Sequence, residues 1–291
     1  MVFSRLTRYL VWSLVAIQNF VDLPARKIRR TRLEYARRKK RVFVSSMPAT
    51  GIEMVIDPTM YFSEVFVNGS YEIELVRYFQ KSLRSGMVCI DAGANVGYFT
   101  LLMAKRVGPQ GLVISFEPTQ KTLGILQRNI RMNGLGNVVS VPLALSDRNG
   151  TMRFNEGPPG YEVYNSAKRI THPSAKDQSF TETSVNCTTL DDYLDAKNIR
   201  RVDIIKLDVE GAELSVLRGM EKTLKANPHA RLIVEFAEQT TRGFGYSAKE
   251  LGTWLTKRGW RLFLMKPFGR ISEVSADQSW TGQMVLVSKT N

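Results

Sequence analysis

The sequence predicts an α/β protein in which a mostly parallel sheet is covered by helices on both faces. Strand-like apolar segments and amphipathic helical segments alternate regularly from residue 87 onward, and this alternation is typical of parallel sheets joined by helical crossovers. A short strand, a glycine-containing turn and a helix follow one another at residues 89–106 (CIDAGANVGYFTLLMAKR). Of the 291 residues, 43% are apolar and 10% aromatic, which suits a chain that buries a core.

The basic charge is concentrated at the start of the chain. Residues 1–41 contain twelve Lys or Arg against two acidic residues, so they supply +10 of the net charge of +14. Residues 9–21 are apolar nearly all round, and residues 26–41 are strongly basic. The apolar run is shorter than the roughly 20 residues of a membrane-spanning helix, and no small-residue cleavage site follows it. We expect an N-terminal arm over residues 1–46 and one folded domain over residues 47–291.

Two interpretations of this arm stay open. It forms a helix lying on an anionic membrane surface, with the basic run on the cytoplasmic side, or a helix packed on the body with a solvated basic linker. Nucleic acid is not an expected partner, because the rest of the chain shows no matching basic excess. Cys89 and Cys187 lack a metal-type spacing and fit a reducing compartment. We expect a cytoplasmic protein, peripheral on the inner face of the membrane under the first interpretation.

The elements of the domain can be assigned in order. Residues 41–56 alternate like a small hairpin. Helical spacing or capping predicts helices at 70–83, 95–107, 119–134, 212–224 and 247–259. Strands are predicted at 87–91, 112–117, 137–145, 202–211 with its turn, 230–236, 260–265 and 281–289. The ligand of such a sheet is expected beyond the carboxyl ends of its strands, where the strand order reverses.

Residues 147–188 interrupt this rhythm. Residues 147–154 resemble one arm of a hairpin, and residues 183–194 supply a strand and a short helix. Between them lies a long polar stretch with Gly and Pro, NEGPPGYEVYNSAKRITHPSAKDQSF. Long loops of this kind often serve as lids or binding segments, so we expect an insertion or lid over about 147–188 within a core of 64–288.

The glycine turn at residues 93–97 carries the main prediction about the ligand. The dinucleotide fingerprint G-x-G-x-x-G does not fit, because Asn95 and Tyr98 stand where its second and third glycines belong. Asp91 closes the preceding strand, and a carboxylate there suits a ligand with an ammonium or sulfonium group. Glu117 ends the next strand and is placed to accept hydrogen bonds from a ribose. These features favour S-adenosylmethionine over a tight corner without a ligand.

Other candidate cofactor contacts follow from position in the predicted sheet. Gly93, Ala94, Asn95 and Gly97 form the turn itself. At the third strand, residues 143–147 (LALSD) occupy the position that usually flanks adenine. Backbone groups of Ala144 and Leu145, with the side chain of Ser146 or Asp147, could read the edge of the ring. Glu72 precedes the first strand and could reach the methionine end.

Six motifs in the same order resemble the FkbM-type methyltransferases: DAGANVGYFT, FEPTQ, ALSD, TTLDDYL, IKLDVEGAE and LIVEF. The resemblance covers roughly residues 64–264, with KLDVEGAE (206–213) as its most specific element, and excludes residues 1–41. It implies a Rossmann-like, seven-stranded class I methyltransferase fold and S-adenosylmethionine as the methyl donor. Similar family members mostly O-methylate sugars or other hydroxyl-bearing small molecules.

Methyl transfer to a hydroxyl needs a base near the transfer line. The fourth strand is expected to end at Asp208, and DVEGAE then places acids around the mouth of the site. We expect the base to be Asp208 or Glu210, with Glu235 next, and Lys206 could keep one of these carboxylates ionised. Glu213 fits equally a catalytic acid or a plain acid at a helix N-terminus.

Three further questions stay open. Several acids at one mouth could bind Mg²⁺, although no spacing demands a metal and we assign no metal ligands. The expected activity is O-methylation of a hydroxyl on a sugar, a glycan precursor or another small molecule. The alternative is an RNA or protein N-methyltransferase that uses the basic arm, although the DVEG turn lacks the Asn/Asp-Pro-Pro-aromatic turn usual for planar amines. A non-catalytic scaffold is disfavoured by the intact cofactor positions.

Overall fold

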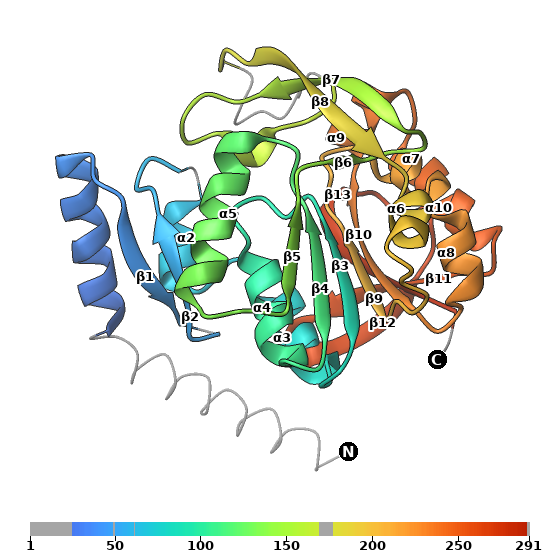
Figure 1. Ribbon diagram of the computed structural model, residues 1–291, viewed down its shortest axis with the longest axis horizontal. Helices are drawn as coiled ribbons and strands as arrows, with labels where there is room; N and C mark the ends of the chain where they lie inside the picture. The colour runs from blue at the N-terminus through green and yellow to red at the C-terminus, as the bar shows by residue number, and fades with distance from the viewer. Residues whose placement is uncertain (1–24, 49, 61, 169–176, 290–291) are drawn as a thin grey trace.

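The computed structural model describes residues 25–48, 50–60, 62–168 and 177–289. An eight-stranded sheet in the order β12–β11–β13–β10–β9–β3–β4–β5 forms the centre of this part of the chain (Figure 1). Its strands are β3 (Val88–Ala92), β4 (Leu112–Phe116), β5 (Val138–Val141), β9 (Ile204–Leu207), β10 (Arg231–Ala237), β11 (Arg261–Lys266), β12 (Arg270–Val274) and β13 (Thr281–Ser288).

The sheet is parallel from β10 through β9, β3 and β4 to β5, whereas β13 runs antiparallel to both β10 and β11. This order and direction agree with the seven-stranded sheet that the resemblance implies, extended at one edge by β12. The predicted α/β class and mostly parallel sheet are therefore confirmed, with eight strands in place of seven. β12 pairs antiparallel with β11 through a turn at residues 267–269, and its short exposed sequence gave no strand signal.

Helices cover both faces of the sheet, as predicted (Figure 1). One face carries α3 (Ile73–Ser82), α4 (Tyr98–Val107) and α5 (Gln120–Met132), and the other carries α6 (Leu190–Ala196), α7 (Glu213–Arg218), α8 (Glu221–Ala226) and α10 (Ala248–Thr256). Alternate strand residues feed two separate cores, since Cys89 packs with the first set and Ile90 with the second. This alternation follows from the period of two along a strand.

The N-terminal part of the described chain packs against the first face. β1 (Phe43–Met47) and β2 (Ile52–Ile56) form the predicted hairpin. The buried side chain of Asn129 on α5 accepts from the Val55 amide at 2.9 Å and donates to the Val96 carbonyl at 2.8 Å. It thereby ties β2 to the glycine turn.

Residues 25–39 are helical and pack on this body in part. Leu33 and Ala36 are buried, and Arg37 donates to the Pro58 carbonyl and the Ser63 hydroxyl. The predicted apolar segment 9–21 lies outside the described residues. No helix in the described part of the chain is long and apolar enough to cross a membrane.

The predicted insertion forms a second, smaller sheet. β6 (Ala144–Leu145), β7 (Gly150–Glu156) and β8 (Thr181–Thr188) associate in the order β6–β8–β7. The third strand, predicted to run over 137–145, is therefore interrupted: β5 ends at Val141, Pro142 follows, and the chain passes to the smaller sheet at β6. Proline lacks the amide that would continue the ladder.

The helix predicted over residues 212–224 is likewise divided. α7 ends at Arg218, and α8 begins at Glu221. Between them, a Cβ added to Gly219 would lie 1.9 Å from the Ser146 carbonyl oxygen, so the chain packs there against the segment after β6. Two short helices, α2 (Ser63–Asn68) and α9 (Glu238–Thr241), were not predicted.

Candidate active site

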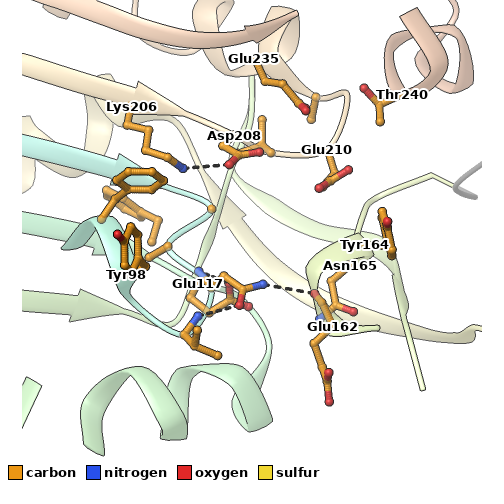
Figure 2. A pocket seen from close by; sticks show the side chains of 18 of the residues that line it. Tyr98, Glu117, Glu162, Tyr164, Asn165, Lys206, Asp208, Glu210, Glu235 and Thr240 are labelled. Carbon is orange, nitrogen blue, oxygen red and sulfur yellow. Dashed lines mark hydrogen bonds and ion pairs between the residues drawn. The ribbon is translucent and has the colours of Figure 1, made fainter. Parts of the chain in front are cut away.

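A cavity of about 440 Å³ opens beyond the carboxyl ends of β3, β4, β9 and β10, as predicted from the strand order. Figure 2 shows its two ends: Asp208, Glu210 and Glu235 gather at one, and Glu117 lies near Glu162 at the other. Its volume is in the range of sites that bind one small molecule. Among the predicted site residues, the lining includes Glu72, Gly93, Ala94, Asn95, Glu117, Ala144, Asp208, Glu210 and Glu235.

The glycine turn brings the ends of β3 and β9 into close contact. Gly93 has φ +75°, and a Cβ added to it would lie 1.8 Å from the Asp208 carbonyl oxygen. Only glycine therefore fits here without a shift of the backbone. Asn95 also has a left-handed backbone, with φ +50°, and its side chain accepts from the Val96 amide at 2.7 Å.

Glu117 follows β4 and links the glycine turn to the start of α5. Its Oε1 accepts from the Thr119 amide and hydroxyl at 3.1 and 2.6 Å, and its Oε2 accepts from the Asn95 amide at 3.1 Å. Burial raises the pKa of Glu117, and the Thr119 and Asn95 hydrogen bonds oppose that shift. A carboxylate offers about four acceptor positions, so Glu117 keeps capacity for a further hydroxyl donor.

Lys206 joins two carboxylates beneath the acidic end of the cavity. Its Nζ lies 3.0 Å from Asp208 Oδ2 and 3.7 Å from Asp91 Oδ1, and its side chain is 3% exposed. The register of β3 and β9 pairs Asp91 with Lys206, which explains the second contact. Burial alone would lower the pKa of Lys206, but Asp208 and Asp91 outweigh it and the pKa is raised.

Glu210 and Glu235 lie in a different electrostatic environment. Burial, followed by the charges of Asp208 and Glu213, raises the pKa of Glu210 well above its ordinary value. Burial, followed by Glu210 and Asp208, does the same for the pKa of Glu235. The Oε2 of Glu235 is buried without a hydrogen-bond partner. For both groups, burial and the neighbouring carboxyls therefore favour the neutral acid.

Glu213 supports the turn that carries these acids. Its Oε1 accepts from the amides of Val209 and Gly211, each at 3.2 Å, and Tyr246 lies 3.3 Å from its Oε2. Glu213 is fully buried and does not line the cavity. Of its two expected roles, the structure places it in that of an acid at a helix N-terminus.

Four predicted cofactor residues do not line the cavity. The side chain of Asp91 is 1% exposed and is engaged by Lys206 and by the Thr100 hydroxyl at 2.5 Å. Gly97 starts α4 behind the turn, with φ +96°. Ser146 and Asp147 contact Ser215 on α7, through the Ser146 hydroxyl and the Asp147 amide. In the structure, these residues form part of the packing between neighbouring elements and are not part of the cavity lining.

The sequence analysis missed two groups of side chains that line the cavity, one apolar and one aromatic. Met152, Phe154 and Ala167 of the insertion line the cavity together with Leu143 and Ala144. The alternation of Met152 and Phe154 on one face of a strand was the available signal.

Part of the cavity lining is a cluster of aromatic side chains in mutual contact. Tyr71 lies 5.6 Å from Phe62, 4.5 Å from Phe66 and 5.5 Å from Tyr98 between ring centroids, and Glu72 is next to it in the chain. These rings come from α2, α4 and the turn before α3, so no single spacing in the sequence relates them.

The acids of the cavity do not form a metal centre in the described part of the chain. No group of three or more His, Cys, Asp or Glu there is arranged to hold a metal ion. Both cysteines are buried free thiols.

Comparison with known proteins gives a consistent assignment. The model of the methyltransferase FkbM domain matches residues 91–262. Methyltransferase 1 of Beauveria bassiana is 32% identical over 170 residues, which cover 54% of this chain and 65% of that protein. Hexuronic acid methyltransferase AglP of Haloferax volcanii is 25% identical over 155 residues, covering 53% of this chain and 59% of AglP.

A third relative is 2-O-methyltransferase NoeI of Sinorhizobium fredii, 26% identical over 145 residues that cover 47% of this chain and 58% of NoeI. The chain thus spans less than two thirds of each of these three relatives. The domain match covers more than half of the chain and includes the glycine turn, Glu117, Asp208 and Glu235. The chain therefore belongs to the methyltransferase FkbM domain family.

Proposed function

We propose that the protein is an S-adenosylmethionine-dependent O-methyltransferase that acts on a hydroxyl of a sugar, a glycan precursor or another small molecule. The observation that carries this proposal is the juxtaposition of the glycine turn with Asp208, which Lys206 contacts at 3.0 Å at the edge of the same cavity. A turn that can hold the methyl donor and a carboxyl group beside it are what methyl transfer to a hydroxyl requires.

The residues of the cavity fit S-adenosylmethionine. Lys206 is the single basic residue among its described lining, and acidic side chains lie at both ends, so hydrogen-bond acceptors for an ammonium group outnumber the competing cation. Glu117 would take the ribose hydroxyls, and the wall of Leu143, Met152 and Phe154 would take the adenine. The turn at Gly93–Asn95 and Glu72 would hold the methionine part. When bound, this cofactor supplies the electrophilic methyl carbon.

Asp208 is the proposed base. It would accept the proton of the acceptor hydroxyl, and Lys206 Nζ lies 3.0 Å from its Oδ2. Burial favours the neutral acid for Glu210 and Glu235, so both would donate hydrogen bonds to neighbouring oxygens of the acceptor.

An oxygen acceptor is favoured over the alternative of an RNA or protein amine. The turn after β9 carries acids, Asp208 and Glu210, and no aromatic side chain on which a planar amine could stack. The names of the relatives AglP and NoeI, a hexuronic acid methyltransferase and a 2-O-methyltransferase, support a sugar hydroxyl. Mg²⁺ is not part of the proposal, because Asp208 is the proposed proton acceptor and Glu210 and Glu235 are the proposed hydrogen-bond donors.

The test is methyl transfer from labelled S-adenosylmethionine to a panel of sugars, lipid-linked sugars, RNA and peptides. Labelling of a hydroxyl acceptor is expected, and labelling of RNA or peptide alone would contradict the proposal. On the acceptor found, Asp208→Asn should lower turnover by about 10²–10⁴-fold and leave the affinity for S-adenosylhomocysteine unchanged. Unchanged turnover in this variant would remove Asp208 as the base.

We further propose that the N-terminal arm associates with an anionic membrane surface. The helix at 25–39 packs through Leu33 and Ala36, so its other side is free to meet a surface. That side carries exposed Ile28 and Tyr35, 66% and 62% exposed. Exposed basic residues of the same helix are Arg26, Lys27, Arg30, Arg32, Arg38 and Lys39. Interleaved basic and apolar side chains are typical of helices at anionic interfaces.

Vesicle sedimentation tests this second proposal. The full chain should bind vesicles containing phosphatidylglycerol and not neutral vesicles. Replacing Arg26, Lys27 and Arg30 by Ser should release most of it, whereas replacing the exposed Lys225 and Lys257 by Ser should not. Equal binding by all three proteins would contradict a role for the arm.

A further inference from the structure

One segment of the insertion, residues 157–166, crosses the cavity from the cofactor turn to the acidic end. At the first end, the Asn95 side-chain amide donates to the Glu162 carbonyl at 3.3 Å. At the second, the Ser166 hydroxyl donates to the Glu210 carbonyl at 2.8 Å. Asn95 and Glu210 both have a left-handed backbone, with φ +50° and +52°, so the segment contacts each turn at the residue with that conformation.

Glu162 is the most constrained side chain of this segment. Its Oε1 lies 2.5 Å from Lys121 Nζ on α5, and its Oε2 accepts from the Gly160 amide at 2.8 Å. Its side chain is 12% exposed, against 53% for Lys121. The ion pair therefore links the segment to α5, the helix that follows Glu117. Figure 2 shows Glu162 at the same end of the cavity as Glu117.

The segment also contains internal hydrogen bonds and packs closely against Thr59. Asn165 accepts from the Gly157 amide at 2.8 Å, and Asn155 and Ser166 exchange backbone hydrogen bonds at 2.7 and 3.1 Å. A Cβ added to Gly160 would lie 2.4 Å from the Thr59 carbonyl oxygen. These contacts hold residues 157–166 together, and the Lys121–Glu162 ion pair connects the segment to α5 of the methyltransferase core.

A second ion pair of the insertion provides a comparison. Arg153 and Glu182 face each other across β7 and β8 at 3.8 Å, with side chains 84% and 61% exposed. Neither residue lines the cavity. This pair has the same charges on the same insertion and no contact with Asn95, Glu117 or Glu210.

We propose that Glu162 is a positioning residue that, through Lys121 and Asn95, holds residues 157–166 across the bound cofactor and couples the cofactor turn to the turn of Glu210. The inference rests on the proposed function, because the ligand is taken to be S-adenosylmethionine. The insertion then contributes chiefly to the cofactor side of the cavity, and acceptor contacts come from Asp208, Glu210 and Glu235.

The test is amide hydrogen exchange with and without S-adenosylhomocysteine, together with its dissociation constant by calorimetry. In the native protein, the ligand should slow exchange in 93–97, in 157–166 and in 209–211. In Lys121→Met and Glu162→Gln, protection of 157–166 and 209–211 should fall while 93–97 stays protected. Binding should weaken about two- to fivefold, the range for a partly exposed ion pair, and the double variant should add little to either change.

Two controls separate positioning from general destabilisation. Lys121→Arg keeps the charge and should restore both protection and affinity. Arg153→Met removes the comparison pair and should alter neither.

Three outcomes would overturn the inference. If the ligand protects 93–97 and never 157–166, the segment does not cover the cofactor, although the proposed cofactor stands. If Lys121→Met and Glu162→Gln behave as the native protein in both measurements, Glu162 does not position the segment. If no region is protected and no binding heat appears, the proposed cofactor fails and the inference with it.

Discussion

Replacing Lys206 by Met should destabilise the protein in a pH-dependent way. The substitution keeps the length of the side chain and removes the charge that lies between Asp91 and Asp208. At 3.7 and 3.0 Å, each attraction amounts to about 5 kcal/mol at an effective dielectric constant of about 20. Desolvation of the three groups offsets much of this, and Asp208 is 23% exposed.

The net cost is set by the carboxylate that is left behind. Removing one partner of a buried pair typically costs about 3–5 kcal/mol. Asp91 has 1% of its side chain exposed, and after the substitution only the Thr100 hydroxyl still contacts it. Its Oδ1 already has no hydrogen-bond partner in the native protein. We therefore expect a loss of about 3 kcal/mol in the free energy of unfolding at pH 8.

The pH dependence follows from the pKa of Asp91. Burial raises this pKa in the folded protein, and Lys206 and Thr100 oppose the shift. A carboxyl whose folded pKa is raised contributes stability below its unfolded pKa, and that contribution is lost as pH rises through the folded pKa. Without Lys206 the pKa of Asp91 rises further. The variant should therefore approach the native protein near pH 4 and fall away from it as pH increases. The pKa of Lys206 is raised from 10.5, so its charge is constant in this window.

Urea unfolding at pH 4.5 and pH 8 measures the effect. Adding Asp91→Asn to Lys206→Met should recover much of the loss at pH 8, because no buried charge is then left unpaired. A loss below about 1 kcal/mol at both pH values, or an equal loss at both, would refute the reasoning, since exposed pairs give that small a value.

Three further predictions concern the cavity. Gly93→Ala places a Cβ 1.8 Å from the Asp208 carbonyl oxygen at φ +75°. It should lower the free energy of unfolding in urea by about 2 kcal/mol or more and abolish binding of S-adenosylhomocysteine. Near-native stability and binding would contradict the close contact. Burial raises the pKa of Glu213 to about 7. The native protein should therefore lose free energy of unfolding as pH rises from about 4.5 to about 7, and Glu213→Gln should lose less over the same range. Equal slopes for the two proteins would contradict this prediction. Lys206 is the single basic residue of the described lining, and two carboxyl groups already contact it. An uncharged sugar should therefore be methylated at least about tenfold more efficiently than the matching uronic acid, whose charge would be left unpaired. Comparable values of kcat/KM would show that another cation receives the acid.

The main site residues were predictable because they stand at strand ends. The carboxyl ends of parallel strands meet at one edge of a sheet, so Gly93, Glu117, Asp208 and Glu235 were expected together, and all four line the cavity. Asp91 also stands near a strand end. Its side chain points beneath the turn because the register pairs it with Lys206, and register between distant strands is not readable from one sequence.

The remaining differences between the predicted and observed elements arise where a strand or a helix is interrupted. Pro142 ends β5, so Ser146 and Asp147 follow a strand of the smaller sheet and contact α7. Gly219 divides the helix predicted over 212–224 because the chain packs against the Ser146 carbonyl. These are tertiary contacts between segments about 70 residues apart in the sequence, which local propensity does not report.

The insertion shows both what composition indicates and what it omits. Its Gly, Pro and polar residues correctly indicated a break in the alternation of strands and helices. They gave no sign that β7 and β8 pair along residues 150–156 and 181–187. Nor did they indicate that Glu162 reaches Lys121 on α5, because a salt bridge between residues 41 apart has no sequence period.

Calorimetric titration with S-adenosylhomocysteine tests the central claim most directly. The native protein should bind one equivalent, and Glu117→Ala should bind at least about tenfold more weakly, since hydrogen bonds to a charged group contribute about 1.5–3 kcal/mol. An absence of binding heat with the native protein would contradict the account. So would equal affinity of the two proteins, because Glu117 would then not hold the ribose.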